Sequence, residues 1–176
     1  MGSTEQIRST SSRLLGGAMV VAGALGFVSA AVGGIDAVLR YGAPTLLFAL
    51  LGWAAFWRPH VVVSDGGVTV VNTLRTVEVP WPAIEGVEGR YGLRLRTAYG
   101  PVTAWAAGAP AGRQRARAHD SSTAQVVAGR LEELRGAGYL DDPRLERPAL
   151  VTTWHAEVVG PVAVLVVASV VLPLLA

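Results

Sequence analysis

The chain has 176 residues and a mass of 18.3 kDa, with 51% hydrophobic residues, 16% charged residues and a mean hydropathy of +0.42. Soluble domains carry about 25% charged residues, so this shortage of charge indicates that part of the surface faces lipid. The sequence has no cysteine, which excludes disulfides, a thiol nucleophile and cysteine-bound zinc. The net charge of +2 is too small to predict nucleic-acid binding.

Three segments without ionisable residues predict membrane-spanning helices. Residues 14–35 provide about 22 residues at 1.5 Å each, which suits a hydrocarbon core of ~30 Å. Residues 42–57 are a slightly short second span, in which Trp53 and Trp57 suit the headgroup zone. Residues 158–176 form the third span. The chain is therefore expected to be a multi-pass membrane protein.

Arginines near the spans predict the orientation. Arg8 and Arg13 precede the first span and Arg58 follows the second, whereas only Arg40 lies in the short loop between them. The positive-inside rule then places the tail at 1–13 and the middle region on the cytoplasmic side of a bacterial plasma membrane. An alternative is that residues 1–30 are a cleaved signal peptide, because small residues stand where cleavage would occur.

The first span carries small residues at every fourth position, which predicts a stripe for close helix packing. These residues are Ala18, Ala22, Gly26, Ala30 and Gly34. Packing within the chain and packing in a homo-oligomer both fit this stripe. Asp36 is expected to pair with Arg40 four residues later, and a proton-relay role for Asp36 is the alternative.

Between the spans, short β-branched segments predict strands. They lie at 60–64, 68–72, 75–80, 87–91, 93–97 and 102–106. Asp65-Gly66-Gly67 predicts a tight hairpin between the first two, and Pro80 with Pro82 predicts a corner after the third. Apolar residues at helical spacing predict a helix at about 121–136. This order is typical of an antiparallel sheet or open barrel capped by a helix.

A resemblance to a known family is carried by the strings WRPHVVVSDGGVTVVNTLRTVEVPWPAIEGV and YGLRLRTAYGPVTAWAA. Its characteristic pieces are Asp65-Gly66-Gly67, Asn72 with Arg75, Val79-Pro80-Trp81 with Ile84, and Ala104-Trp105-Ala106. They resemble the bacterial pleckstrin-homology-like (PH) domains of actinobacterial membrane proteins, which include the low-molecular-weight protein antigen 6 group. The resemblance implies a bent antiparallel sheet of seven strands capped by a C-terminal helix, membrane association and no catalytic residues.

The predicted domain order follows from these segments. The PH-like domain is expected at 58–139, and residues 140–156 are a linker or an additional strand. Only six strands are predicted before the helix, so residues 150–154 are the candidate for the seventh.

Basic residues of the domain are candidate contacts for anionic lipid headgroups. They are Arg94, Arg96, Arg113, Arg115 and Arg117. A solvated face is the simpler interpretation of the first two, because glutamates lie near them in the sequence. Phosphoinositide binding at the first hairpin is not expected, because that hairpin holds Asp65 and no base.

Trp105 is the candidate contact for a protein partner, because it alternates with two alanines and aromatic residues dominate binding interfaces. Trp81 is expected to be buried at the corner. The histidines His60, His119 and His155 are isolated in the sequence, and no catalytic, metal-binding or cofactor-binding motif is present.

The sequence therefore predicts a non-enzymatic membrane protein whose cytoplasmic PH-like domain serves as a protein-binding or lipid-binding scaffold. Its expected partners are the lipid bilayer with its anionic headgroups and an envelope protein. The alternative is an accessory or regulatory subunit of a membrane transporter or channel, in which the first helix and Asp36 matter most.

Overall fold

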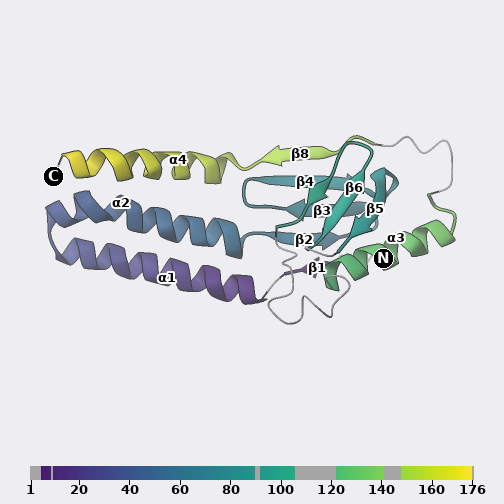
Figure 1. Cartoon of the computed structure of the whole chain (residues 1–176), viewed down its shortest axis with the longest axis horizontal. Helices are drawn as coiled ribbons and strands as arrows, with labels where there is room; N and C mark the ends of the chain where they lie inside the picture. Colours follow the sequence, from purple (N-terminus) through teal and green to yellow (C-terminus); the bar gives the residue numbers. More distant parts are fainter. Residues whose placement is uncertain (1–4, 9, 90–91, 106–121, 141–147, 176) are drawn as a thin grey trace. The chain divides into compact units, whose positions relative to one another are not determined.

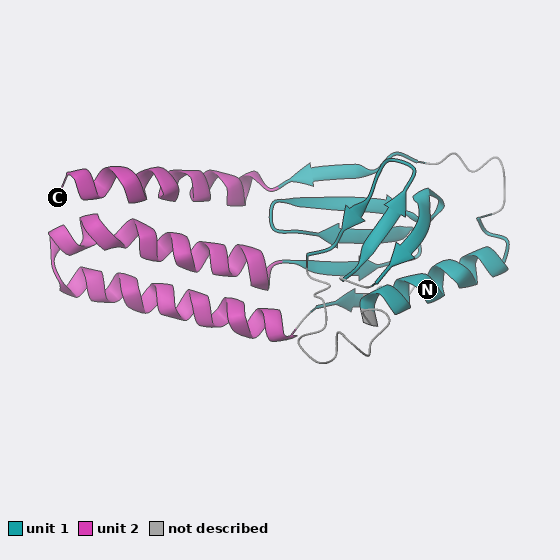
Figure 2. Ribbon diagram, in the orientation of Figure 1, with its two compact units in different colours: residues 1–9, 59–154 teal, residues 10–58, 155–176 magenta. Residues whose placement is uncertain are grey.

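A computed structural model describes residues 5–8, 10–89, 92–105, 122–140 and 148–175 of the chain (Figure 1). The chain divides into two compact units, which Figure 2 distinguishes by colour. One unit consists of Thr10–Arg58 and His155–Ala176 and is helical. The other consists of Met1–Ser9 and Pro59–Trp154 and contains the strands.

The helical unit contains three apolar helical segments. They are α1 (Thr10–Val32), α2 (Ile35–Gly52) with the π-helical turn Trp53–Trp57, and α4 (Ala156–Val171) with the 3-10 turn Leu172–Leu174. By length and composition, each segment is able to cross a membrane. The loop between α1 and α2 is shorter than predicted, because Asp36 and Arg40 lie inside α2. Gly34 makes this tight turn with a φ of 94°, a conformation that favours glycine.

Helices α1 and α2 pack through small residues. Gly16 and Gly23 of α1 are buried, as are Gly42 and Gly52 of α2. A Cβ atom at Gly23 would lie 2.7 Å from the Ala49 Cβ and 2.7 Å from the Thr45 carbonyl oxygen. The two helix backbones therefore approach each other closely along this seam.

The seam differs from the stripe that the sequence predicts. Gly26 contacts Thr45 and Ala30 is buried, but Ala18, Ala22 and Gly34 are exposed within this chain. A spacing of four residues advances by about 40° around the helix at each step, whereas a spacing of seven drifts by only about 20°. The buried residues of α1, Gly16, Gly23 and Ala30, keep the spacing of seven and so stay on one face.

In the described residues of the strand-containing unit, the strands form two antiparallel sheets. The first has the order β1 (Glu5–Ile7), β2 (His60–Val63), β3 (Gly67–Val71), β4 (Arg75–Pro80) and β8 (Val151–Trp154). The second has the order β5 (Ile84–Glu88), β6 (Arg94–Thr97) and β7 (Val102–Thr103). Helix α3 spans Ser122–Gly136.

One hydrophobic core joins the two sheets and α3. Alternate residues of the first sheet point into it, as the burial patterns of β2 and β4 show. Its members include Val61, Val70, Val79, Trp81, Leu93, Leu95, Ala124, Val127 and Leu131. The predicted fold class, apolar helices plus an antiparallel β domain with a C-terminal helix, is confirmed.

Two edge strands complete the first sheet. Residues 151–154 form β8 against β4, which is the additional strand left open by the sequence. Strand β1 pairs with β2, whereas the sequence predicts a tail at these residues. Three residues between polar neighbours carry no strand pattern of their own, so only the pairing with β2 defines this strand.

Candidate functional site

The five-stranded sheet has two ends that differ in how the chain continues from them. The strand register places five strand-terminal residues at one end of the sheet, and these are Ile7, His60, Val71, Arg75 and Trp154. From this end the chain continues from β1 towards α1 and from β8 into α4, and it enters β2 after the helical turn that ends at residue 57. We call it the linked end. The opposite end carries the tight turn between β2 and β3, and we call it the hairpin end.

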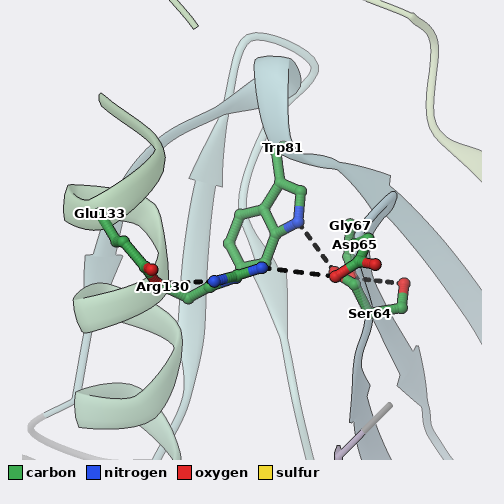
Figure 3. Close-up of polar contacts among 6 residues, drawn as sticks. All are labelled: Ser64, Asp65, Gly67, Trp81, Arg130 and Glu133. Carbon is green, nitrogen blue, oxygen red and sulfur yellow. Dashed lines mark hydrogen bonds and ion pairs between the residues drawn. The ribbon is translucent and has the colours of Figure 1, made fainter. Parts of the chain in front are cut away.

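The hairpin end is fixed by hydrogen bonds between three segments (Figure 3). The backbone nitrogen and the hydroxyl of Ser64 each donate to the Gly67 carbonyl at 3.0 Å. The indole nitrogen of Trp81, a buried residue of the corner after β4, donates to the Ser64 carbonyl at 2.9 Å. Burial of the Trp81 ring therefore anchors the hairpin to the corner, and the prediction that Trp81 is buried is confirmed.

Helix α3 adds an ion-pair network to the hairpin end. The Arg130 guanidinium lies 2.7 Å from Glu133 and 3.3 Å from Asp65. Figure 3 shows both ion pairs. Glu133, and to a lesser extent Asp65, raise the pKa of Arg130 above its ordinary value. Two carboxylates therefore surround one guanidinium at this hairpin, an arrangement that disfavours binding of a phosphate group.

At the linked end, Asn72 organises the residues around Trp105. The Asn72 side-chain amide donates to the Thr103 carbonyl at 2.9 Å, and the Trp105 backbone nitrogen donates to the Asn72 Oδ1 at 2.7 Å. These two bonds hold the segment after β7 against the turn between β3 and β4. Trp105 itself is 64% exposed, so its backbone is fixed while its side chain faces outward.

A second exposed tryptophan lies at the same end. Trp154 ends β8 directly opposite Arg75, whose guanidinium lies 5.8 Å from the centre of the Trp154 ring. Leu74, in the turn between β3 and β4, is also exposed. The linked end therefore presents Leu74, Trp105 and Trp154 from three separate segments.

Two of the five predicted basic contacts, Arg94 and Arg96, lie in the described residues. Arg94 and Arg96 are exposed on β6, and Arg96 lies 3.4 Å from Glu88. A Cβ atom at Gly86 would lie 2.7 Å from the Arg96 guanidinium, so this arginine extends across β5. Arg113, Arg115 and Arg117 lie outside the described residues.

The helical unit contains a polar cluster that sequence reasoning missed. The Arg58 guanidinium contacts His155 Nδ1 at 3.0 Å and Glu157 Oε1 at 2.5 Å. Arg58 also lies 5.8 Å from the centre of the Trp53 ring. The sequence offers one signal for this cluster. Its residues flank the second and third predicted spans, and the predicted orientation places both of these flanks on the same side of the membrane. The cluster joins the end of the second apolar segment to the start of α4.

No group of three or more histidine, aspartate or glutamate side chains suited to a metal ion occurs in the described parts of the chain.

Residues 58–137 match the family model described as bacterial PH domain. No curated protein and no solved structure gives a significant match to the chain. The matched segment includes strands β2 to β7 and α3, whereas the edge strands β1 and β8 lie outside it. The protein therefore contains a bacterial PH domain at residues 58–137, flanked in the sequence by three helices apolar enough to span a membrane.

Proposed function

We propose that this protein is a non-enzymatic integral membrane protein that displays its PH domain on the cytoplasmic side of a bacterial plasma membrane, as a binding and scaffolding module for an envelope protein or anionic lipid. The observation that carries the proposal is the order of segments. The PH match begins at residue 58, directly after an apolar segment that ends at Trp57, and α4 begins at Ala156. Both sides of the domain are therefore bounded by candidate spans.

The cytoplasmic orientation is supported by the charged residues at the helix ends. Arg13 lies 4.7 Å from the centre of the Trp57 ring, and Arg58 follows that residue directly, so the domain-linked ends of these helices are basic and aromatic. The opposite ends carry both Arg40 and Asp36. The positive-inside rule favours the arginine-rich side as cytoplasmic.

A binding role is supported by the polar contacts of the domain. Its charged side chains form surface pairs, such as Arg96 with Glu88 and Arg130 with Asp65. Ion pairs of this kind hold charged side chains in place on a binding surface. Catalysis needs titratable groups that converge on a shared pocket. Anionic-lipid contact by Arg113, Arg115 and Arg117 remains a prediction of the sequence.

Site-specific photo-crosslinking in living bacteria tests this function. A photoreactive amino acid at the exposed positions Arg94 and Tyr99 samples the PH domain, and matched variants at Leu25 and Val164 sample the helices. We expect a discrete adduct with a protein or a lipid from the PH-domain positions. Adducts from the helix positions alone would contradict the proposal and favour an accessory subunit of a transporter or channel.

A further inference from the structure

Three large apolar side chains gather at the linked end of the five-stranded sheet. Leu74 is 46% exposed, Trp105 is 64% exposed and Trp154 is 63% exposed. Asn72 binds the segment that carries Trp105, and Arg75 faces Trp154 across the strand pair. The turn from Asn72 to Arg75 therefore brings all three together, and we call them the apolar rim.

Exposed tryptophans at a fixed backbone position indicate an interaction surface. An indole ring buries a large apolar area while its N–H group seeks a polar partner, so it suits the boundary between hydrocarbon and water. The backbone of Trp105 is held by the Asn72 bond of 2.7 Å, and Trp154 lies in a paired strand. Little conformational entropy of the backbone is then lost when these side chains bind.

The chain connections identify the surface that covers the rim. A single residue, His155, separates Trp154 from α4, and two residues separate the turn ending at Trp57 from β2. A residue spans at most about 3.5 Å, so Trp154 lies within about 10 Å of the first residue of α4. The headgroup layer on each side of a bilayer is of this order of thickness. The linked end of the sheet is thus held close to the headgroups wherever α4 enters the membrane.

The charge of the linked end agrees with this location. Arg8 follows β1, and Arg75 lies next to Trp154; both are exposed. A cation close to an anionic bilayer surface strengthens membrane binding. The hairpin end lies at the far end of the same strands. There, two carboxylates surround Arg130, so its charge does not favour contact with an anionic surface.

We infer that the apolar rim of Leu74, Trp105 and Trp154 binds the headgroup layer of the bilayer that the chain's own helices cross. This inference rests on the proposed membrane-displayed PH domain and names the ligand of its linked end. The rim fixes the domain on the membrane with its hairpin end towards water. A partner protein then meets the hairpin end or the faces of the sheets.

The test compares two turns of the same sheet in the full-length protein. Because the chain has no cysteine, Leu74→Cys and Gly66→Cys each provide one labelling site for an environment-sensitive fluorophore. Gly66 is the matched control, because it lies in the exposed hairpin and a Cβ atom there meets open space. The labelled proteins are placed in lipid nanodiscs that contain phosphatidylcholine and phosphatidylglycerol, with or without lipids that carry a quencher near the headgroup.

We expect blue-shifted emission and strong lipid quenching at position 74, and water-like emission without lipid quenching at position 66. Equal, water-like signals at both positions would overturn the inference. A blue shift at position 74 without lipid quenching would also overturn it, because protein and not lipid would then cover the rim. Quenching at both positions would show that the domain lies flat and that the rim is not the contact.

A second labelling position is needed because Leu74→Cys changes a residue of the rim itself. Thr103→Cys places the fluorophore at the exposed end of β7, next to Asn72, and it is expected to be quenched as position 74 is. The change of both Leu74 and Trp105 to Gln in the Thr103→Cys protein should clearly reduce that quenching, because only Trp154 and the link to α4 then remain, and unchanged quenching would overturn the inference. None of these fluorescence readouts depends on the side of the membrane that the domain faces or on adducts with a partner. The inference about the rim and the proposed function can therefore be contradicted independently of each other.

Discussion

The helical unit and the strand-containing unit, which Figure 2 colours separately, bury opposite kinds of residue. In the strand-containing unit the buried residues are large and branched, such as Val61, Val79 and Leu95. In the helical unit the buried residues are mostly small, such as Gly16, Gly23 and Gly52. Leu25 of α1 is 65% exposed, whereas Leu95 of β6 is 0% exposed.

The difference follows from the solvent that each unit requires. In water, removal of apolar surface from solvent drives the large side chains inward. In lipid this driving force is absent between helices, so close van der Waals packing of small residues stabilises their contacts instead. The burial pattern of α1 and α2 is therefore evidence for a lipid environment that is independent of hydropathy.

The largest expected effect is on the free energy of unfolding, and it distinguishes a leucine buried in the strand-containing unit from an exposed leucine of α1. Leu95→Ala removes a fully buried side chain from the core and should reduce the free energy of unfolding by about 2–5 kcal/mol. Leu25→Ala is the matched change on a lipid-facing helix and should have little effect. Urea unfolding of the full-length protein in mild detergent measures both, and equal losses would contradict the comparison.

The next effect tests the seam between α1 and α2. Gly23→Leu should cost about 1–3 kcal/mol because its side chain meets Ala49 and the Thr45 backbone, which cannot move aside without separating the helices. Ala22→Leu, one residue earlier and exposed, is the control. Thermal unfolding in detergent should distinguish the two. A loss with Ala22→Leu that depends on protein concentration would instead support the predicted stripe as a contact between copies of the chain.

A smaller effect is expected at the hairpin end. Trp81→Phe keeps most of the buried ring but removes the indole donor to the Ser64 carbonyl, and should cost about 1 kcal/mol or somewhat more. Faster amide hydrogen exchange in the segment 64–67 would show the loosened hairpin. Unchanged exchange there would mean that the bond does not anchor the turn.

The smallest effect is expected for Arg130→Gln. The Arg130 pairs with Glu133 and Asp65 are exposed to solvent, and exposed ion pairs add little stability. The unfolding midpoint should stay within error of that of the unchanged protein, at low and at high salt. A clear, salt-sensitive loss would show that this network is stronger than its exposure indicates.

Much of the fold could be predicted because its signals are local. Ala-rich and Val-rich runs without charge predict the apolar helices, and the Asp65-Gly66-Gly67 turn predicts the hairpin that the register confirms. The strand at 5–7 could not be predicted in this way, because it exists only through its pairing with β2.

The candidate site was less predictable because it depends on long-range contacts. Asn72 and Trp105 are 33 residues apart, and Arg58 and Glu157 are 99 residues apart. The predicted stripe of small residues in α1 shows a different limit of sequence-based prediction. Because α1 contains many small residues, several of its faces could pack closely, and only the position of α2 determines which face forms the seam. The exposure of Trp105 agrees with the alternation in the sequence, whereas its neighbours at the linked end follow only from long-range hydrogen bonds and strand register.

The central claim, a PH domain displayed on the cytoplasmic side between spans, is tested most directly by cysteine accessibility in intact cells. Ile35→Cys labels the first residue of α2, next to the turn from α1, and Ala98→Cys labels the turn between β6 and β7; both positions are exposed. A membrane-impermeant maleimide should label position 35 in intact cells and position 98 only after the membrane is permeabilised. Labelling of position 98 in intact cells, or identical behaviour at both positions, would contradict the account.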